Sequence, residues 1–279
     1  LLANLAGFDP ETDQVAPADL LPFDLWALDR ARLTQDEVRT AWRAYEFPRA
    51  QHAIHQFCAS DMGAIYLDVT KDRQYTSGAD SRARRSCQTA MYHIAEALCR
   101  WIAPVLSFTA DEIWEHLPGQ RGPSVLLAEW TRLPGGEPGD PVVDRGWWQR
   151  LLLVREAVSR TLERVRAAGE LRGSLDAVVT VYASPGLLAD LERIDGELHV
   201  LLITSSATVR PLTEAPAGST VTEIEGVGSV VVEATASTEP KCPRCWHHVA
   251  DVGRYPEHPT LCGRCVENIE GPGQSHRVL

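Results

Sequence analysis

Four cysteines near the C-terminus constrain this chain more than any other feature. They form two Cys-x-x-Cys pairs separated by sixteen residues, namely Cys242, Cys245, Cys262 and Cys265. Two such tight turns can place four thiolates around one zinc ion, with Zn–S bonds of about 2.3 Å. Pro243 and Gly263, inside the pairs, are residue types that suit tight turns. The spacing predicts one structural zinc ion with these four cysteines as ligands.

Two disulfides or a redox-active pair are alternative interpretations of this spacing. The remaining cysteines, Cys58, Cys87 and Cys99, lie singly in sequence with helical periodicity, as reduced core thiols do. This distribution favours zinc and predicts a cytoplasmic protein. No apolar run approaches the roughly 20 residues that a membrane-spanning helix needs, so no membrane partner is expected.

The formal net charge of −11 is unevenly distributed along the chain. Residues 170–240 hold eleven acidic and three basic side chains, whereas residues 71–86 hold five basic and two acidic ones. A local field matters more than the total charge when a phosphate backbone is attracted to one face of a protein. The acidic balance therefore does not exclude an RNA partner.

The first half of the chain has helical periodicity between Asp24 and His116. Apolar side chains recur every three or four residues in two stripes, which are Ile54, Cys58, Ile65 and Val69, and then Cys87, Met91, Ile94, Leu98 and Ile102. Ser81 or Asp80 can cap the second helix, and Pro104 interrupts it. We predict a helix bundle over residues 1–140.

The second half begins with a helix and changes to short strands. A Pro- and Gly-rich linker over 133–141 precedes a helix from about 144 to 168. β-branched runs then predict strands at 177–183, 220–225 and 228–234, with a helix over 186–195. We expect a connecting helix and a small α/β module over 141–236, then a zinc ribbon or knuckle with a loosely ordered tail over 237–279. The fold class is mainly α.

A series of motifs along the chain resembles one protein family. The motifs are KDRQY from Lys71, RRSCQTA from Arg84, LSFTADE from Leu106 and KCPRCWH from Lys241. Together they closely resemble the C-terminal part of bacterial isoleucyl-tRNA synthetases, which comprises an anticodon-binding helical domain and a zinc module. The helical motifs alone are similar to several class I synthetases for aliphatic amino acids, and the four-cysteine module selects the isoleucine branch.

The resemblance implies that the chain binds the anticodon arm of the isoleucine tRNA. The full-length enzymes of this family attach isoleucine to tRNA with ATP, on a domain with HIGH and KMSKS motifs, and hydrolyse wrong products in an editing domain. Neither motif occurs here, and Lys71 and Lys241 are the only lysines. We therefore expect an N-terminally truncated part of an enzyme, monomeric and without catalytic residues. The catalytic and editing domains of the same polypeptide would be its partners.

Eight side chains are candidates for RNA contact, and each has a structural alternative. They are Lys71, Arg73, Arg84, Arg85, Gln88, Arg244, Trp246 and Arg264. Arginine forks on a helix suit the phosphates of an A-form stem, but they can equally form ion pairs within the domain. A lysine or arginine near a helix end can complement the helix dipole instead. Trp246 can stack on a splayed-out base or cover the zinc knuckle.

Two other functions compete with this interpretation. Formamidopyrimidine-DNA glycosylases end in a similar four-cysteine finger, which would make the chain a DNA-binding protein. Those enzymes begin with a proline nucleophile followed by glutamate, whereas this chain begins with Leu1 and Leu2. A free-standing zinc ribbon that binds other proteins is the third hypothesis.

Overall fold

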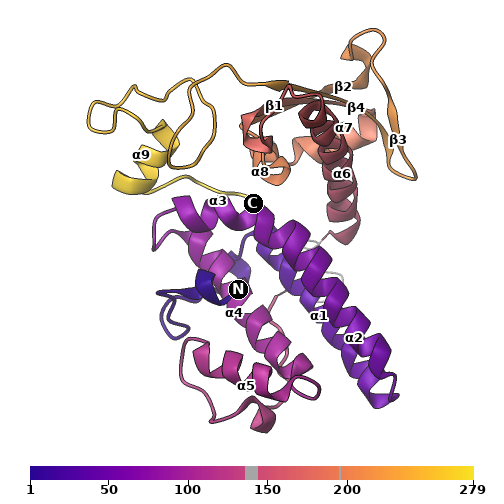
Figure 1. The fold of residues 1–279 in the computed structure, drawn as a ribbon, viewed down its shortest axis with the longest axis vertical. Helices are drawn as coiled ribbons and strands as arrows, with labels where there is room; N and C mark the ends of the chain where they lie inside the picture. Colours follow the sequence, from indigo (N-terminus) through magenta and orange to yellow (C-terminus); the bar gives the residue numbers. More distant parts are fainter. Residues whose placement is uncertain (136–143, 195) are drawn as a thin grey trace. The chain divides into compact units, whose positions relative to one another are not determined.

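A computed structural model describes residues 1–135, 144–194 and 196–279 (Figure 1). The chain divides into two compact units, Leu1–Val143 and Asp144–Leu279, and each is described by itself. The predicted linker over 133–141 and the predicted boundary at residue 140 fall largely outside the described residues. Residues 144–236 and 237–279 lie in one unit, so the separation of the predicted segments 141–236 and 237–279 into two domains remains a proposal.

The first unit is a bundle of α-helices. Its helices are α1 (Pro22–Arg43), α2 (Phe47–Gln56), α3 (Leu67–Thr76), α4 (Arg82–Ile102) and α5 (Ser107–His116), with short 3-10 turns at Leu2–Leu5, Pro17–Asp19 and Val125–Leu127. Helix α1 packs against both α2 and α4. The Ser81 hydroxyl accepts the backbone N–H of Arg84 at 3.3 Å and so caps α4, as predicted. The helix bundle is confirmed.

A ten-residue π-helix, Phe57–Tyr66, joins α2 to α3. Its buried side chains are Phe57, Met62 and Tyr66, whereas Ile54, Cys58 and Ile65 of the predicted stripe are only half-buried. The prediction was wrong here because π-helical hydrogen bonds join residues five apart, which rotates the inward face away from the α-helical repeat. Helix α4 follows the ordinary repeat and buries Cys87, Met91 and Ile94 as expected.

The second unit combines helices with one sheet. Helix α6 (Arg145–Ala167) precedes strands β1 (Ala177–Ala183), β2 (Ser206–Pro211), β3 (Thr222–Ile224) and β4 (Gly228–Ala236), in the spatial order β2-β1-β4-β3. Strand β1 is parallel to β2 and antiparallel to β4. Ala177, Val179 and Val181 of β1 are fully buried. The helices α6, α7 (Pro185–Glu192) and α8 (Leu198–Leu202) contact the sheet and one another.

The zinc-binding segment and the chain end complete this unit. Helix α9 spans Gly263–Glu270. The predicted loose tail is instead held by Glu197, whose carboxylate accepts the backbone N–H groups of Arg277, Val278 and Leu279 at 2.6–2.9 Å. The expectation failed because tail sequence does not reveal a buried carboxylate some 80 residues away. In the described part of the chain, every helix is too short or too polar to cross a membrane.

Candidate metal centre and nucleic-acid interface

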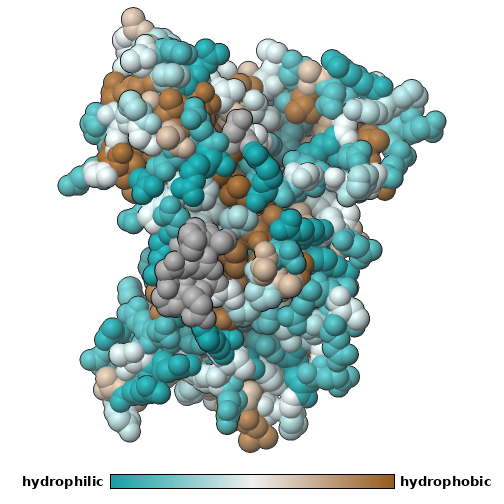
Figure 2. Space-filling model, turned by 180° about the vertical axis from the view of Figure 1, so that it is seen from behind, coloured by the Kyte–Doolittle hydropathy of each residue, from teal (hydrophilic) through white to brown (hydrophobic). Residues whose placement is uncertain are grey.

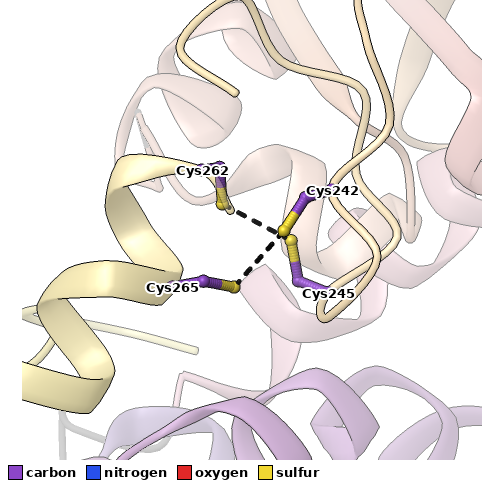
Figure 3. A group of neighbouring side chains, drawn as sticks. All are labelled: Cys242, Cys245, Cys262 and Cys265. Carbon is purple, nitrogen blue, oxygen red and sulfur yellow. Dashed lines mark hydrogen bonds between the residues drawn. The ribbon is translucent and has the colours of Figure 1, made fainter. Parts of the chain in front are cut away.

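The four cysteines converge from two separate turns (Figure 3). Their Sγ atoms all lie within 4.8 Å of one another, and the Cys242–Cys265 and Cys245–Cys262 distances are 3.8 and 3.7 Å. A tetrahedron with Zn–S bonds of about 2.3 Å has edges of about 3.8 Å. All four side chains are buried, so water does not compete for the site. The donor set and the spacing fit one zinc ion.

Local backbone contacts hold each turn in this geometry. The N–H of Trp246 donates to the carbonyl of Cys242 at 2.8 Å, and Trp246 takes the left-handed conformation, with φ of 67°, that closes the turn. On the other side, the Asp251 carboxylate accepts the N–H of Gly263 at 2.8 Å, where α9 begins between the two ligands Cys262 and Cys265. Both ligand pairs are thus fixed by hydrogen bonds that do not involve the metal.

The metal is the main element of this small core. Among the residues that the structure describes, Val249, Val252 and Leu261 are the partly buried apolar side chains that pack against the four cysteines. In the metal-free chain, hydrogen bonding from Cys262 lowers the pKa of the Cys245 thiol, while the same pairing raises the pKa of Cys262. Zinc binding displaces the protons that the cysteines share through these hydrogen bonds, because each cysteine binds the metal as a thiolate.

Hydrogen bonds attach the zinc segment to the α/β module of the same unit. The N–H of His248 donates to the Ser205 hydroxyl at 2.6 Å, and its Nε2 lies 3.1 Å from the Asp176 carboxylate. The His247 ring contacts the ring of His199 on α8, with 5.9 Å between centroids. Neither histidine belongs to the ligand cluster, in agreement with the four-thiolate prediction.

Arg73, a candidate for RNA contact, is buried in the helix bundle. Its side chain is 2% exposed, and its Nη2 lies 2.6 Å from the Asp24 carboxylate. The same carboxylate accepts hydrogen bonds from Tyr66 at 2.7 Å and from Ser86 at 2.5 Å. Burial lowers the pKa of Arg73, but the charge and hydrogen bond of Asp24 act together with Cys87 and Tyr66 to raise it by more, so the pKa lies above its ordinary value. Arg73 therefore stabilises the bundle, and its buried guanidinium is not exposed for contact with RNA.

Two further candidates on α4 are committed to contacts within the bundle. Gln88 is fully buried and donates to the carbonyl of Asn4 at 2.9 Å. Arg85 forms ion pairs with Asp13 at 3.1 Å and Asp80 at 3.0 Å, and its side chain is only 15% exposed. For both residues the structural alternative fits the geometry better than an RNA contact.

The remaining candidates on α3 and α4 face solvent at least in part. Lys71 is exposed and pairs with Asp68 at 2.9 Å. Arg84 is half-buried and makes no side-chain ion pair among the described residues. Tyr75, which the sequence analysis passed over, is 69% exposed and lies one turn after Lys71 on α3. An aromatic residue within the basic KDRQY motif was the signal that could have identified it.

Arg244 lies inside the first cysteine pair, Trp246 directly follows that pair, and Arg264 lies inside the second. Trp246 is 59% exposed, so it does not cover the zinc site, and Lys241 Nζ lies 5.7 Å from its ring centroid. Arg264 Nη2 lies 3.0 Å from His247 Nδ1, and Arg244 is half-exposed. The zinc segment therefore presents an exposed aromatic ring beside Lys241, with two further arginines on its turns.

A family model that describes the anticodon-binding domain of tRNA ligases matches residues 24–181, which is more than half of the chain. The chain belongs to this family. The match covers α1 to α6 and reaches into β1. The resemblance of the KDRQY and RRSCQTA motifs to the helical domain of synthetases is thereby confirmed.

Curated relatives of this chain are named isoleucine–tRNA ligases. The protein from Pseudomonas aeruginosa is 51% identical over 274 residues, which cover 98% of this chain and 29% of the relative. The proteins from Pseudomonas paraeruginosa and Pseudomonas entomophila are 51% and 50% identical with the same coverage. The chain thus spans 29% of the length of these relatives.

A second family model, a zinc finger found in FPG and IleRS, matches residues 239–268. The match contains all four cysteines, so the prediction of one structural zinc ion is confirmed. This finger alone would also fit the glycosylase alternative. The glycosylase is not favoured, because the rest of the chain matches tRNA ligases.

Proposed function

We propose that this chain binds the anticodon arm of the isoleucine tRNA as the tRNA-docking part of an isoleucine–tRNA ligase. The observation that carries the proposal is the combination of an anticodon-binding domain with the zinc finger, in a chain 51% identical to such a ligase over 98% of its length. The longer polypeptide would attach isoleucine to the tRNA with ATP. It would act in the cytoplasm as a monomer.

This part of the enzyme would contribute binding energy and no catalytic group. Energy gained at the anticodon arm orients the tRNA, so that its 3′ end is held at a distant active site. Such positioning can raise the rate of a reaction whose atoms the binding surface never touches. The catalytic and editing domains of the same polypeptide would supply the chemistry.

The first proposed contact surface lies on α3 and α4. Lys71 and Tyr75 share one face of α3, since they are four residues apart. Arg84 lies in the first turn of α4, which packs against α3. Their guanidinium and ammonium groups suit phosphates, and the exposed Tyr75 ring suits a nucleobase. Contacts to phosphates would strengthen binding to any tRNA.

The second proposed contact surface is the first zinc knuckle. The exposed Trp246 ring offers a flat apolar face, and Lys241 lies beside it. Anticodon bases in a loop can be splayed out and stacked on such a ring, while neighbouring arginines hold the backbone. Arg244 and Arg264 are the arginines on the two turns, and RNA contact would compete with the hydrogen bond that Arg264 makes to His247. This surface would supply discrimination between anticodon loops.

Titration with RNA hairpins tests the proposal. The chain is titrated with an anticodon-arm hairpin of the isoleucine tRNA and with a hairpin of the same stem but another anticodon. We expect measurable binding to both and tighter binding to the isoleucine hairpin. Lack of binding to either hairpin would refute the proposed function. Equal affinities for the two hairpins would show that this chain does not discriminate between anticodons.

A further inference from the structure

Exposed large apolar side chains gather at one end of the helical unit. Tyr45 is 80% exposed and Phe47 is 49% exposed at the corner between α1 and α2. Phe108, at the start of α5, is 93% exposed, and Val105 and Leu106 beside it are more than half exposed. Both corners lie at the lower end of this unit in Figure 1. Figure 2, seen from behind, shows a few apolar, brown atoms among hydrophilic ones at that end.

Residues next to both corners line one cavity, which places the corners on the same side of the bundle. The cavity has a volume of about 410 Å³ and is lined by Arg39, Trp42, Arg43, Pro104 and Trp130. Trp42 contacts Phe47 with 5.2 Å between ring centroids, and Phe47 contacts Tyr45 at 5.9 Å. We define the corner surface as Trp42, Tyr45, Phe47, Val105, Leu106 and Phe108.

The corner surface is held in a fixed shape. Tyr45 takes a left-handed backbone conformation with φ of 59°, which is costly for a residue with a side chain. Hydrogen bonds on both sides maintain it, since the N–H of Tyr45 donates to Trp42 at 3.1 Å and that of Glu46 donates to Ala41 at 2.9 Å. A rigid turn with aromatic side chains loses little entropy when it binds a partner.

The charges around this surface favour a protein over a nucleic acid. Near the α1–α2 corner, Arg39, Arg43 and Arg49 are balanced by Asp36, Glu37 and Glu46, so the local net charge is zero. Phosphate binding needs an excess of positive charge, and the aliphatic side chains of Val105 and Leu106 give RNA nothing to stack on. Apolar aromatic surface next to arginine is the composition that protein interfaces enrich.

Two arginines indicate what the partner offers. Arg43 is exposed, and Arg39 lies over the Trp130 ring at 5.7 Å. Across the ranges 1–135, 144–194 and 196–279, neither guanidinium is paired with a carboxylate. An apolar partner surface that brings acidic groups to its edge would pair both.

We propose that the corner surface docks the part of the ligase polypeptide that lies outside this chain, through an apolar face edged with acidic groups. This inference rests on the proposed function. Its basis is that the chain spans 29% of the length of relatives such as the Pseudomonas aeruginosa ligase. The other part of such a polypeptide is large enough to cover the corner surface. Contiguous apolar surface of this kind is uncommon on a protein that functions alone.

Footprinting on a chimera tests the docking. The matching segment of the Pseudomonas aeruginosa ligase is replaced by this chain, and hydroxyl radicals label exposed side chains in the chimera and in the chain alone. We expect labelling of Tyr45, Phe47 and Phe108 to fall at least fivefold in the chimera. Tyr255 and Trp246, exposed aromatic residues outside the corner surface, serve as internal controls and should be labelled equally in both.

Substitutions give a second readout in the same chimera. Val105→Ser and Phe108→Ser should lower its isoleucylation rate, whereas Val221→Ser, a matched change at an exposed valine on the second unit, should not. All these variants should leave the hairpin affinity of the chain alone unchanged. If the wild-type chain does not bind the hairpin, the proposed function is refuted, but the labelling of the corner surface in the chimera still tests the docking.

Several outcomes would overturn the docking. Equal labelling of the corner surface in the chimera and in the chain alone would show that the rest of the ligase does not cover it. Protection of the isolated chain that grows with its concentration would assign the surface to a second copy. Protection by a saturating anticodon hairpin would assign it to RNA.

Discussion

At the residue scale, the Arg73–Asp24 pair shows that a charged residue in a sequence can serve either folding or binding. Both side chains are at most 2% exposed, and Asp24 also accepts hydrogen bonds from Tyr66 and Ser86. A buried ion pair gains little over an apolar pair, but removing one partner leaves an uncompensated buried charge. The network therefore matters for folding of the bundle rather than for contact with RNA.

Arg73→Ala should destabilise the chain by about 3–5 kcal/mol, as expected when one member of a buried ion pair is removed. Lys71→Ala is the matched control, because Lys71 pairs with Asp68 on the same helix but is 62% exposed. Its effect should stay below about 1 kcal/mol. Urea denaturation of the helical unit measures both changes. Equal losses for the two variants would contradict the structural role of Arg73.

A second residue-scale prediction separates the two proposed RNA surfaces. Arg84→Ala should weaken binding of the isoleucine hairpin and of the other hairpin by the same factor, because phosphate contacts carry no sequence information. Trp246→Ala should reduce the preference for the isoleucine hairpin, since stacking on a splayed-out base depends on the loop. Arg73→Ala, if it folds, should leave both affinities unchanged. A preference that survives Trp246→Ala would limit the zinc segment to a structural role.

At the element scale, the zinc segment consists of two turns and α9 around four sulfur atoms. Few apolar side chains support it, so the metal supplies most of its folding energy. Removing zinc with a chelator should unfold residues 240–270 while the helices of the first unit persist. Metal analysis should find one zinc per chain, lost with Cys262→Ser. Hydrogen exchange measured by segment checks the prediction, and slow exchange in the metal-free segment would contradict it.

The sequence correctly predicted those elements that depend on residues close together in the chain. The cysteine spacing located the metal site, the β-branched runs located β1, β3 and β4, and Ser81 marked the start of α4. The π-helix was missed because its hydrogen bonds join residues five apart, a period that a search for the α-helical repeat does not detect. Strand β2 was missed because it ends in Pro211 and is held by pairing with β1. Such a strand depends on a partner far away in the sequence.

At the scale of the whole molecule, a chain with a net charge of −11 is proposed to bind a polyanion. If total charge governed the encounter, added salt would screen repulsion and affinity for RNA would rise. If the basic groups on α3, α4 and the zinc turns contact phosphates, each contact releases condensed counterions and affinity falls with salt. The sign of the salt dependence therefore decides between a global and a local electrostatic account.

We expect the affinity for the isoleucine hairpin to fall as salt rises. With three to five phosphate contacts, the logarithm of the binding constant should fall by about 2 to 4.5 per tenfold increase in salt, at roughly 0.7–0.9 per contact. Lys71→Gln should reduce this slope by about one contact, whereas Arg43→Gln, beside the corner surface, should leave it unchanged. Titrations at several salt concentrations measure the slopes. An affinity that is flat or rises with salt would show that the local basic groups do not hold the phosphates, and that binding to RNA must come from stacking alone.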